Sequence, residues 1–199
     1  MMPSTGRAAM AREPTVAVAP AVALAPAVAL AMAGSALLLL RLRLIGYPSA
    51  PVLFAGIYAL VGVASLAVPI GPQDDRRLSP ASALALGVGA MAVATVVSGP
   101  VIPVRLGPQA LVLNSLAALC EEAFFRRFLY GRLAAFGAVA AVAATALLFA
   151  LVHLPAYGMA AFWVDLGAGL LLSWQRWASG TWTVPAATHV AANLLVVVP

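Results

Sequence analysis

Apolar blocks long enough to cross a lipid bilayer recur along the whole chain of 199 residues. A membrane-spanning helix needs about 20 predominantly apolar residues, and the blocks approach or exceed that length. Hydrophobic residues make up 64% of the sequence and charged residues only 9%, which is too apolar for a soluble globular domain. The sequence therefore predicts an all-α integral membrane protein, a polytopic bundle of transmembrane helices without a separate soluble domain.

The blocks are separated by glycine, proline and charged residues, and their number predicts about seven helical spans. Residues 1–14 form a polar N-terminal segment, and the apolar run after it is too long for a signal-peptide core. We therefore expect a retained first span, three N-terminal spans over residues 15–108 and a C-terminal core over 109–199. The blocks are residues 15–40, 48–70, 80–103, 109–130, 136–154, 158–175 and 181–198.

The net charge of +5 comes from arginine, because the sequence contains no lysine. The arginines flank the apolar blocks, which is typical of topology signals and not of a nucleic-acid-binding surface. Arginine in place of lysine, with abundant alanine, is typical of a GC-rich bacterium, so we expect a bacterial cytoplasmic membrane. Alternate ends of the predicted spans divide the arginines into two sets, and the larger set marks the cytoplasmic side. That set includes the N-terminal segment, so the N-terminus is predicted to be cytoplasmic. That set is Arg7, Arg12, Arg76, Arg77, Arg126, Arg127, Arg132 and Arg176, against Arg41, Arg43 and Arg105.

Two adjacent acids, Glu121 and Glu122, lie inside the fourth apolar block. Ionised groups at membrane depth are costly, and they persist where they are paired, face a polar cavity or perform chemistry. Arg126 follows Glu122 by four residues, so a helix would place the two on one face as an ion pair. Because successive helical residues are rotated by about 100°, Glu121 would face a different groove, where it could act as a general base.

Both histidines of the chain lie in later apolar blocks. His153 is near the end of the fifth block, and His189 precedes Asn193 by four residues in the seventh. Taken singly, such residues are more often structural, since polar side chains also hold membrane helices together by hydrogen bonds. Together with the acid pair they place polar groups on three helices, which favours a functional site. Asp165, in the sixth block, is interpreted as structural or interfacial.

Three short motifs, in order and spacing, resemble the signature of the CAAX protease and bacteriocin-processing family of intramembrane proteases, also called the Abi family. The resemblance covers about residues 109–198 and extends to the type II CAAX prenyl endopeptidases. The first three spans carry no recognisable signature. Glu-Glu-x-x-x-Arg matches Glu121, Glu122 and Arg126, Phe-x-x-x-His matches Phe149 and His153, and His-x-x-x-Asn matches His189 and Asn193.

The resemblance implies a glutamate-type intramembrane endopeptidase with a conical catalytic cavity formed by the four C-terminal spans. Glu121 would activate a water molecule, with His153 sharing or orienting the proton. His189 and Asn193 would then hold the oxyanion. The substrate would be a membrane-associated or lipidated peptide or protein in the lipid bilayer: a prenylated tail, a bacteriocin leader or a regulatory protein.

The same resemblance makes Glu122 with Arg126 a buried strut. No cofactor is expected, but the sequence leaves a zinc-dependent variant open, with Glu121, His153 and His189 as ligands. The His-Glu-x-x-His zinc motif is absent. A non-catalytic membrane scaffold or bacteriocin-immunity protein, binding a peptide in the same cavity, is the alternative from another class. A small proton-relay transporter ranks last, because the first three spans offer no relay.

Overall fold

A computed structural model of the protein describes residues 20–44, 47–70, 76–98 and 107–195, and every regular element in these ranges is helical. The all-α prediction is confirmed for this part of the chain, while the polar segment 1–14 lies outside it. The elements are α1 (Pro20–Leu44), α2 (Ala50–Ala67), α3 (Pro80–Ser98), α4 (Pro108–Glu122), the π-helix η1 (Ala123–Leu129), α5 (Tyr130–Leu133), the 3-10 helix η2 (Ala134–Phe136), α6 (Ala138–Ser179) and α7 (Thr183–Leu195).

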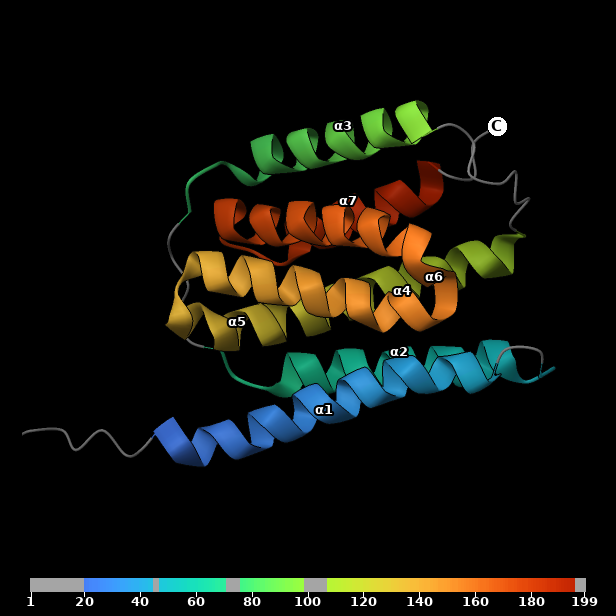
Figure 1. Ribbon diagram of the computed structural model, residues 1–199, viewed down its shortest axis with the longest axis horizontal. Helices are drawn as coiled ribbons and strands as arrows, with labels where there is room; N and C mark the ends of the chain where they lie inside the picture. The colour runs from blue at the N-terminus through green and yellow to red at the C-terminus, as the bar shows by residue number, and fades with distance from the viewer. Residues whose placement is uncertain (1–19, 45–46, 71–75, 99–106, 196–199) are drawn as a thin grey trace, which may run out of the picture.

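The helices form a layered bundle (Figure 1). Helices α1 and α2 lie along one side and α3 along the other, with α4, α6 and α7 between them. The layers fit together because α2 packs on α4, α4 on α7, and α7 on α3. A buried aromatic cluster joins the layers at η1, where Phe124, Phe125 and Phe128 are fully buried. The C-terminal helices therefore form the inside of the bundle.

Three of the described helices, α2, α3 and α6, are long and apolar enough to cross a membrane, by length and composition. Large apolar side chains such as Val52, Val96 and Val139 are more than two-thirds exposed, which suits a surface in contact with lipid. These features support an integral membrane protein. The count of seven spans stays a prediction, because the apolar part of α1 is shorter and α4 continues into a π-helix.

Helix α6 is a hairpin that combines the fifth and sixth predicted blocks. A straight helix would separate Thr145 from Ser173 by about 42 Å at 1.5 Å per residue, yet their hydroxyl oxygens are 3.0 Å apart. The reversal occurs at Gly158, three residues after Pro155, where φ is 78° and ψ is −177°. The predicted break between these blocks is therefore present as a turn between a first arm (138–157) and a second arm (159–179) of α6 (Figure 1).

Close packing of these two arms depends on Gly169. A Cβ atom there would lie 3.0 Å from the carbonyl oxygen of Ala146 and 3.1 Å from its Cα, both backbone atoms. We expect Gly169→Val to overpack the contact, reduce the free energy of unfolding by about 1–3 kcal/mol and lower the thermal midpoint in detergent. Gly167→Val is the matched control, since a Cβ there meets no atom within 4 Å. Equal losses in the two variants would contradict the close approach.

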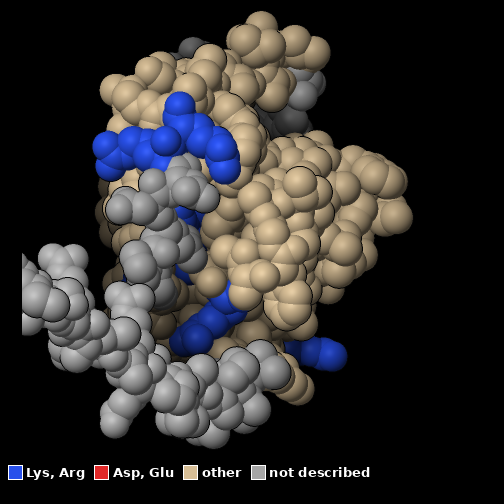
Figure 2. Space-filling model, turned by 90° about the vertical axis from the view of Figure 1, so that its left-hand side faces the viewer, with Lys and Arg blue, Asp and Glu red and all other residues tan. Residues whose placement is uncertain are grey.

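Arginine side chains gather at the end of the bundle that Figure 2 presents. Arg127 and Arg132 donate hydrogen bonds to backbone carbonyls at the C-terminal end of α2. The Arg77 guanidinium lies 4.4 Å from the centre of the Trp177 ring, at the end of α6. The positive-inside rule predicts that this end faces the cytoplasm. Three of the arginines that flank the apolar blocks, Arg7, Arg12 and Arg105, lie outside the described residues.

Candidate active site

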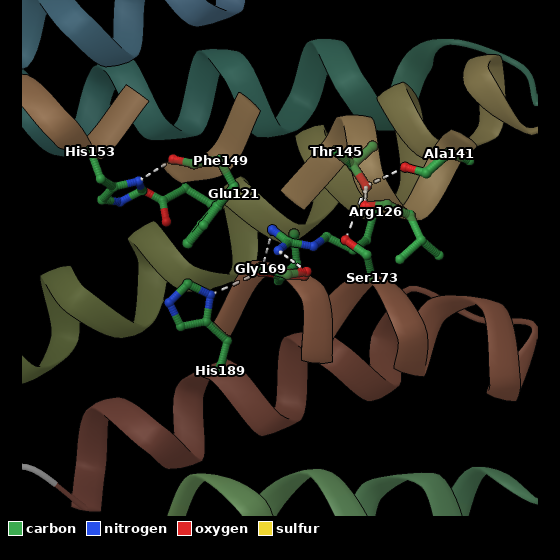
Figure 3. A network of polar contacts seen from close by, with 11 residues as sticks. Glu121, Arg126, Ala141, Thr145, Phe149, His153, Gly169, Ser173 and His189 are labelled. Carbon is green, nitrogen blue, oxygen red and sulfur yellow. Dashed lines mark hydrogen bonds and ion pairs between the residues drawn. The ribbon is translucent and has the colours of Figure 1, made fainter. Parts of the chain in front are cut away.

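The first cluster surrounds Glu121, which lies near the C-terminal end of α4 and is only 4% exposed. Its Oε1 atom is 3.8 Å from Nε2 of His153, on the first arm of α6. The same oxygen accepts a hydrogen bond of 3.2 Å from the hydroxyl of Tyr58, on α2. Figure 3 shows the carboxylate turned toward the His153 ring. Glu121 and His153, selected from the sequence, thus meet across two helices, and Tyr58 is a third member that the motifs do not reveal.

His153 is oriented by its own helix. Its Nδ1 atom lies 2.8 Å from the carbonyl oxygen of Phe149, which can only accept, so Nδ1 carries the hydrogen. In the neutral imidazole, Nε2 then holds a lone pair on the side of Glu121. A carboxylate oxygen and a bare nitrogen repel each other at this distance unless a donor serves both. A water molecule has the two O–H groups needed to satisfy both acceptors.

The second cluster surrounds Glu122, which is fully buried. Its Oε1 atom accepts a 3.0 Å hydrogen bond from Nη1 of Arg126, so the ion pair expected from the four-residue spacing is present. Nδ1 of His189, on α7, lies 2.9 Å from the same oxygen. The two adjacent acids therefore face different partners, as the rotation of successive helical residues predicts.

The two α7 residues predicted to hold the oxyanion, His189 and Asn193, both contact α4. His189 is positioned by Glu122, and because a carboxylate accepts, its Nδ1 is the donor. Asn193 donates from Nδ2 to the backbone carbonyl of Asn114 on α4, at 3.2 Å. With Nδ1 committed to Glu122, His189 offers a second N–H at Nε2 only as the imidazolium. The contact of His189 with Glu122 depends on how α7 packs against α4, so the spacing within the seventh block did not predict it.

Arg126 lies in the π-helix η1 and is fully buried. Besides its bond to Glu122, Nη2 donates to the carbonyl oxygen of Gly169 at 3.3 Å, on the second arm of α6. In return, Nε of Arg176 donates to the backbone oxygen of Arg126 at 3.0 Å. Short π-helical segments are rare and occur often at functional sites. The apolar pattern predicted an uninterrupted α-helix here. A π-helix has more residues per turn than an α-helix, and the apolar pattern does not distinguish the two.

Phe149 joins the two clusters through its ring. The ring centre lies 4.6 Å from the Arg126 guanidinium carbon and 4.4 Å from the centre of the His153 ring. The His189 ring packs edge-on against it at 5.9 Å. A buried aromatic face stabilises the guanidinium by a cation–π contact and keeps water from the buried charges.

The three residues that the sequence suggested as zinc ligands do not form a group in the described part of the chain. Among the residues that the structure describes, no three histidine, cysteine, aspartate or glutamate side chains are grouped to hold a metal ion. The bond from Nδ1 of His189 to Glu122, at 2.9 Å, leaves Nε2 as the ring nitrogen that a metal ion could meet. The zinc-dependent variant therefore stays a prediction.

The conical cavity over the site stays a prediction. A groove of about 460 Å³ lies instead between the N-terminal parts of α2 and α4. Its lining is apolar except for one glutamine and contains none of the motif residues. The lining residues are Pro51, Val52, Ala55, Pro108, Gln109, Val112 and Leu113.

Residues 103–195 match the family described as type II CAAX prenyl endopeptidase Rce1-like. The matched segment contains all three motifs and the helices α4 to α7 that carry them. No curated protein and no solved structure matches the chain. The family is a protease family, so the match confirms the resemblance drawn from the motifs. Over residues 103–195 the chain is thus similar to the Rce1-like family of type II CAAX prenyl endopeptidases.

Proposed function

We propose that the protein is an intramembrane endopeptidase that hydrolyses a peptide bond in a membrane-associated or lipidated protein or peptide. The observation that carries the proposal is the pairing of Glu121 with His153. A buried carboxylate oxygen and an imidazole nitrogen, both acceptors, lie 3.8 Å apart within a domain of a protease family. Such a pair is suited to bind and deprotonate one water molecule.

Hydrolysis proceeds in two steps at this pair. Glu121 takes a proton from the bound water, whose oxygen forms a bond to the scissile carbonyl carbon while the carbonyl electron pair moves to its oxygen. The tetrahedral intermediate then collapses, the carbon–nitrogen bond breaks, and the departing amine receives the proton from Glu121. His153 holds the water through Nε2 and shares the proton during the transfer. General-base catalysis of this kind contributes about 10²–10⁴-fold in rate.

The oxyanion is stabilised from α7. His189 acts in its imidazolium form, because Nδ1–H is held by Glu122 and the second N–H at Nε2 is then available to a developing negative charge. Asn193 supplies a neutral donor after leaving the Asn114 carbonyl. Arg126 fixes Glu122, so the strut positions the oxyanion site indirectly.

The proposal is tested with purified full-length protein in lipid vesicles and a fluorescent peptide that carries a prenylated C-terminal CAAX sequence. A second peptide, unprenylated but membrane-spanning, covers the other substrate class. We expect mass spectrometry to show two fragments from at least one peptide, and His153→Ala to lower kcat by about 10²-fold or more. A chelator should leave the rate unchanged.

Other outcomes would refute parts of this function. Binding of both peptides without fragments would favour the scaffold or immunity role. Loss of cleavage with chelator, restored by zinc, would replace the metal-free mechanism. Thermal unfolding of the His153→Ala variant in detergent shows whether a lost rate reflects chemistry or misfolding.

A further inference from the structure

We infer that Tyr58, on α2 and outside the segment matched by the family, is a positioning residue that holds the Glu121 carboxylate in its reactive orientation. The inference rests on the proposed function. It adds a component from the N-terminal half of the chain, in which the sequence shows no motif. Tyr58 is 63 residues from Glu121 along the chain, so only the packing of the bundle brings them together.

The hydrogen bond itself is specific. Tyr58 is 7% exposed, and its hydroxyl donates to Oε1 of Glu121 at 3.2 Å, the oxygen that also faces His153. A buried tyrosine hydroxyl requires a polar partner, and a carboxylate makes the bond charge-assisted. The bond from Tyr58 restricts rotation of the carboxylate about its last bond while Oε1 faces His153. The proton-accepting oxygen is thereby kept toward the imidazole.

The packing of α2 fixes where Tyr58 can be. Gly62, one turn further along α2, lies so close to α4 that an added Cβ would be 2.7 Å from the Cys120 sulfur. Val61, between them on the same helix, is 1% exposed. The contact of α2 with α4 therefore has little freedom to slide. A rigid contact beside Glu121 is what a positioning residue needs to hold a catalytic group precisely.

The charged and titratable groups around Glu121 come from several elements. Tyr58 on α2 and His153 on α6 face its Oε1 atom. Cys120 precedes it on α4, and the Arg126 charge on η1 acts on the same region. Among these, Tyr58 stabilises the ionised carboxylate by a hydrogen bond that Phe would remove without changing charge. Its loss should therefore move proton uptake by Glu121 to higher pH.

The test compares Tyr58→Phe with the wild type in the vesicle assay. We expect kcat to fall about tenfold, with KM within about twofold, because one hydrogen bond to a charged group is lost. The acidic limb of the pH–rate profile should move to higher pH. Tyr130→Phe, which alters another buried tyrosine near the arginine-rich end, should keep both the rate and the profile.

A readout that does not need turnover separates this inference from the proposed function. The infrared carbonyl band of protonated Glu121, identified by its absence in Glu121→Gln, should titrate at higher pH in Tyr58→Phe than in wild type. That shift supports the Tyr58 contact even if neither peptide is cleaved, a result that would refute only the protease function. An unshifted band, or a Tyr58→Phe variant with wild-type kcat and pH profile, would overturn the inference.

Discussion

Glu121→Gln should lower kcat by about 10²–10⁴-fold, the largest single effect on activity expected in this chain. Glutamine has nearly the same shape as glutamate, and its side-chain oxygen can still accept the hydrogen bond from Tyr58. It cannot take a proton from water, so the first step of hydrolysis is lost while the fold remains. The measurement is peptide cleavage in vesicles over hours, with the thermal midpoint as a check on folding.

A double variant sharpens this prediction. If Glu121 and His153 act on one water molecule, the combined Glu121→Gln/His153→Ala variant should be little worse than Glu121→Gln alone, because the second change removes nothing that still works. Glu13→Gln, an equivalent replacement in the polar N-terminal segment, serves as the control. A Glu121→Gln variant within tenfold of wild type would assign the general base to another group.

Arg126→Met should reduce the free energy of unfolding by about 3–5 kcal/mol, the largest stability effect we expect. The variant leaves Glu122 fully buried with only His189 as donor, and it also removes the bond to the Gly169 carbonyl. A charge left unpaired in a dry interior costs more than the attraction that held the pair. Denaturation in mixed detergent micelles, followed by tryptophan fluorescence, measures the loss.

Removing the Glu122 charge as well should restore much of the free energy of unfolding that Arg126→Met loses. In Arg126→Met/Glu122→Gln neither charge remains, so the double variant should be more stable than Arg126→Met alone. Exposed Arg43 gives the control, since Arg43→Met changes the same side chain outside the buried cluster. Additive losses from the two buried substitutions would show that their pairing contributes little. Cleavage by the double variant should stay low, because the carboxylate that positions His189 is gone.

Interactions within one helix could be predicted from the sequence. Glu122 and Arg126 are four residues apart, so helical geometry alone predicts their ion pair. The break near Gly158 could be predicted for a related reason, because proline and glycine alter the backbone conformation at their own positions. Local stereochemistry therefore predicted how residues of one helix face each other.

Contacts between helices could not be predicted in this way. Tyr58 has no motif because its role depends on how α2 packs against α4. Gln175, buried on the second arm of α6, donates to the Ala83 carbonyl on α3 and to Thr188 on α7, and periodicity gives no sign of this link. The facing of His189 toward Glu122 likewise follows from the rotation of α7 in the bundle. Such relations depend on helix rotation and translation, which a single sequence leaves free.

The position of Arg126 relative to its partners also bears on how the chain enters the membrane. Its acceptor on α6, Gly169, is synthesised 43 residues later, and His189 follows Glu122 by 67. A charged residue at the centre of an inserting helix costs about 2.5–3.5 kcal/mol. Glu122 is only four residues from Arg126, so the segment carries its own counterion while the later helices are still in the ribosome. The ion pair can thus lower the barrier to insertion before any active site exists.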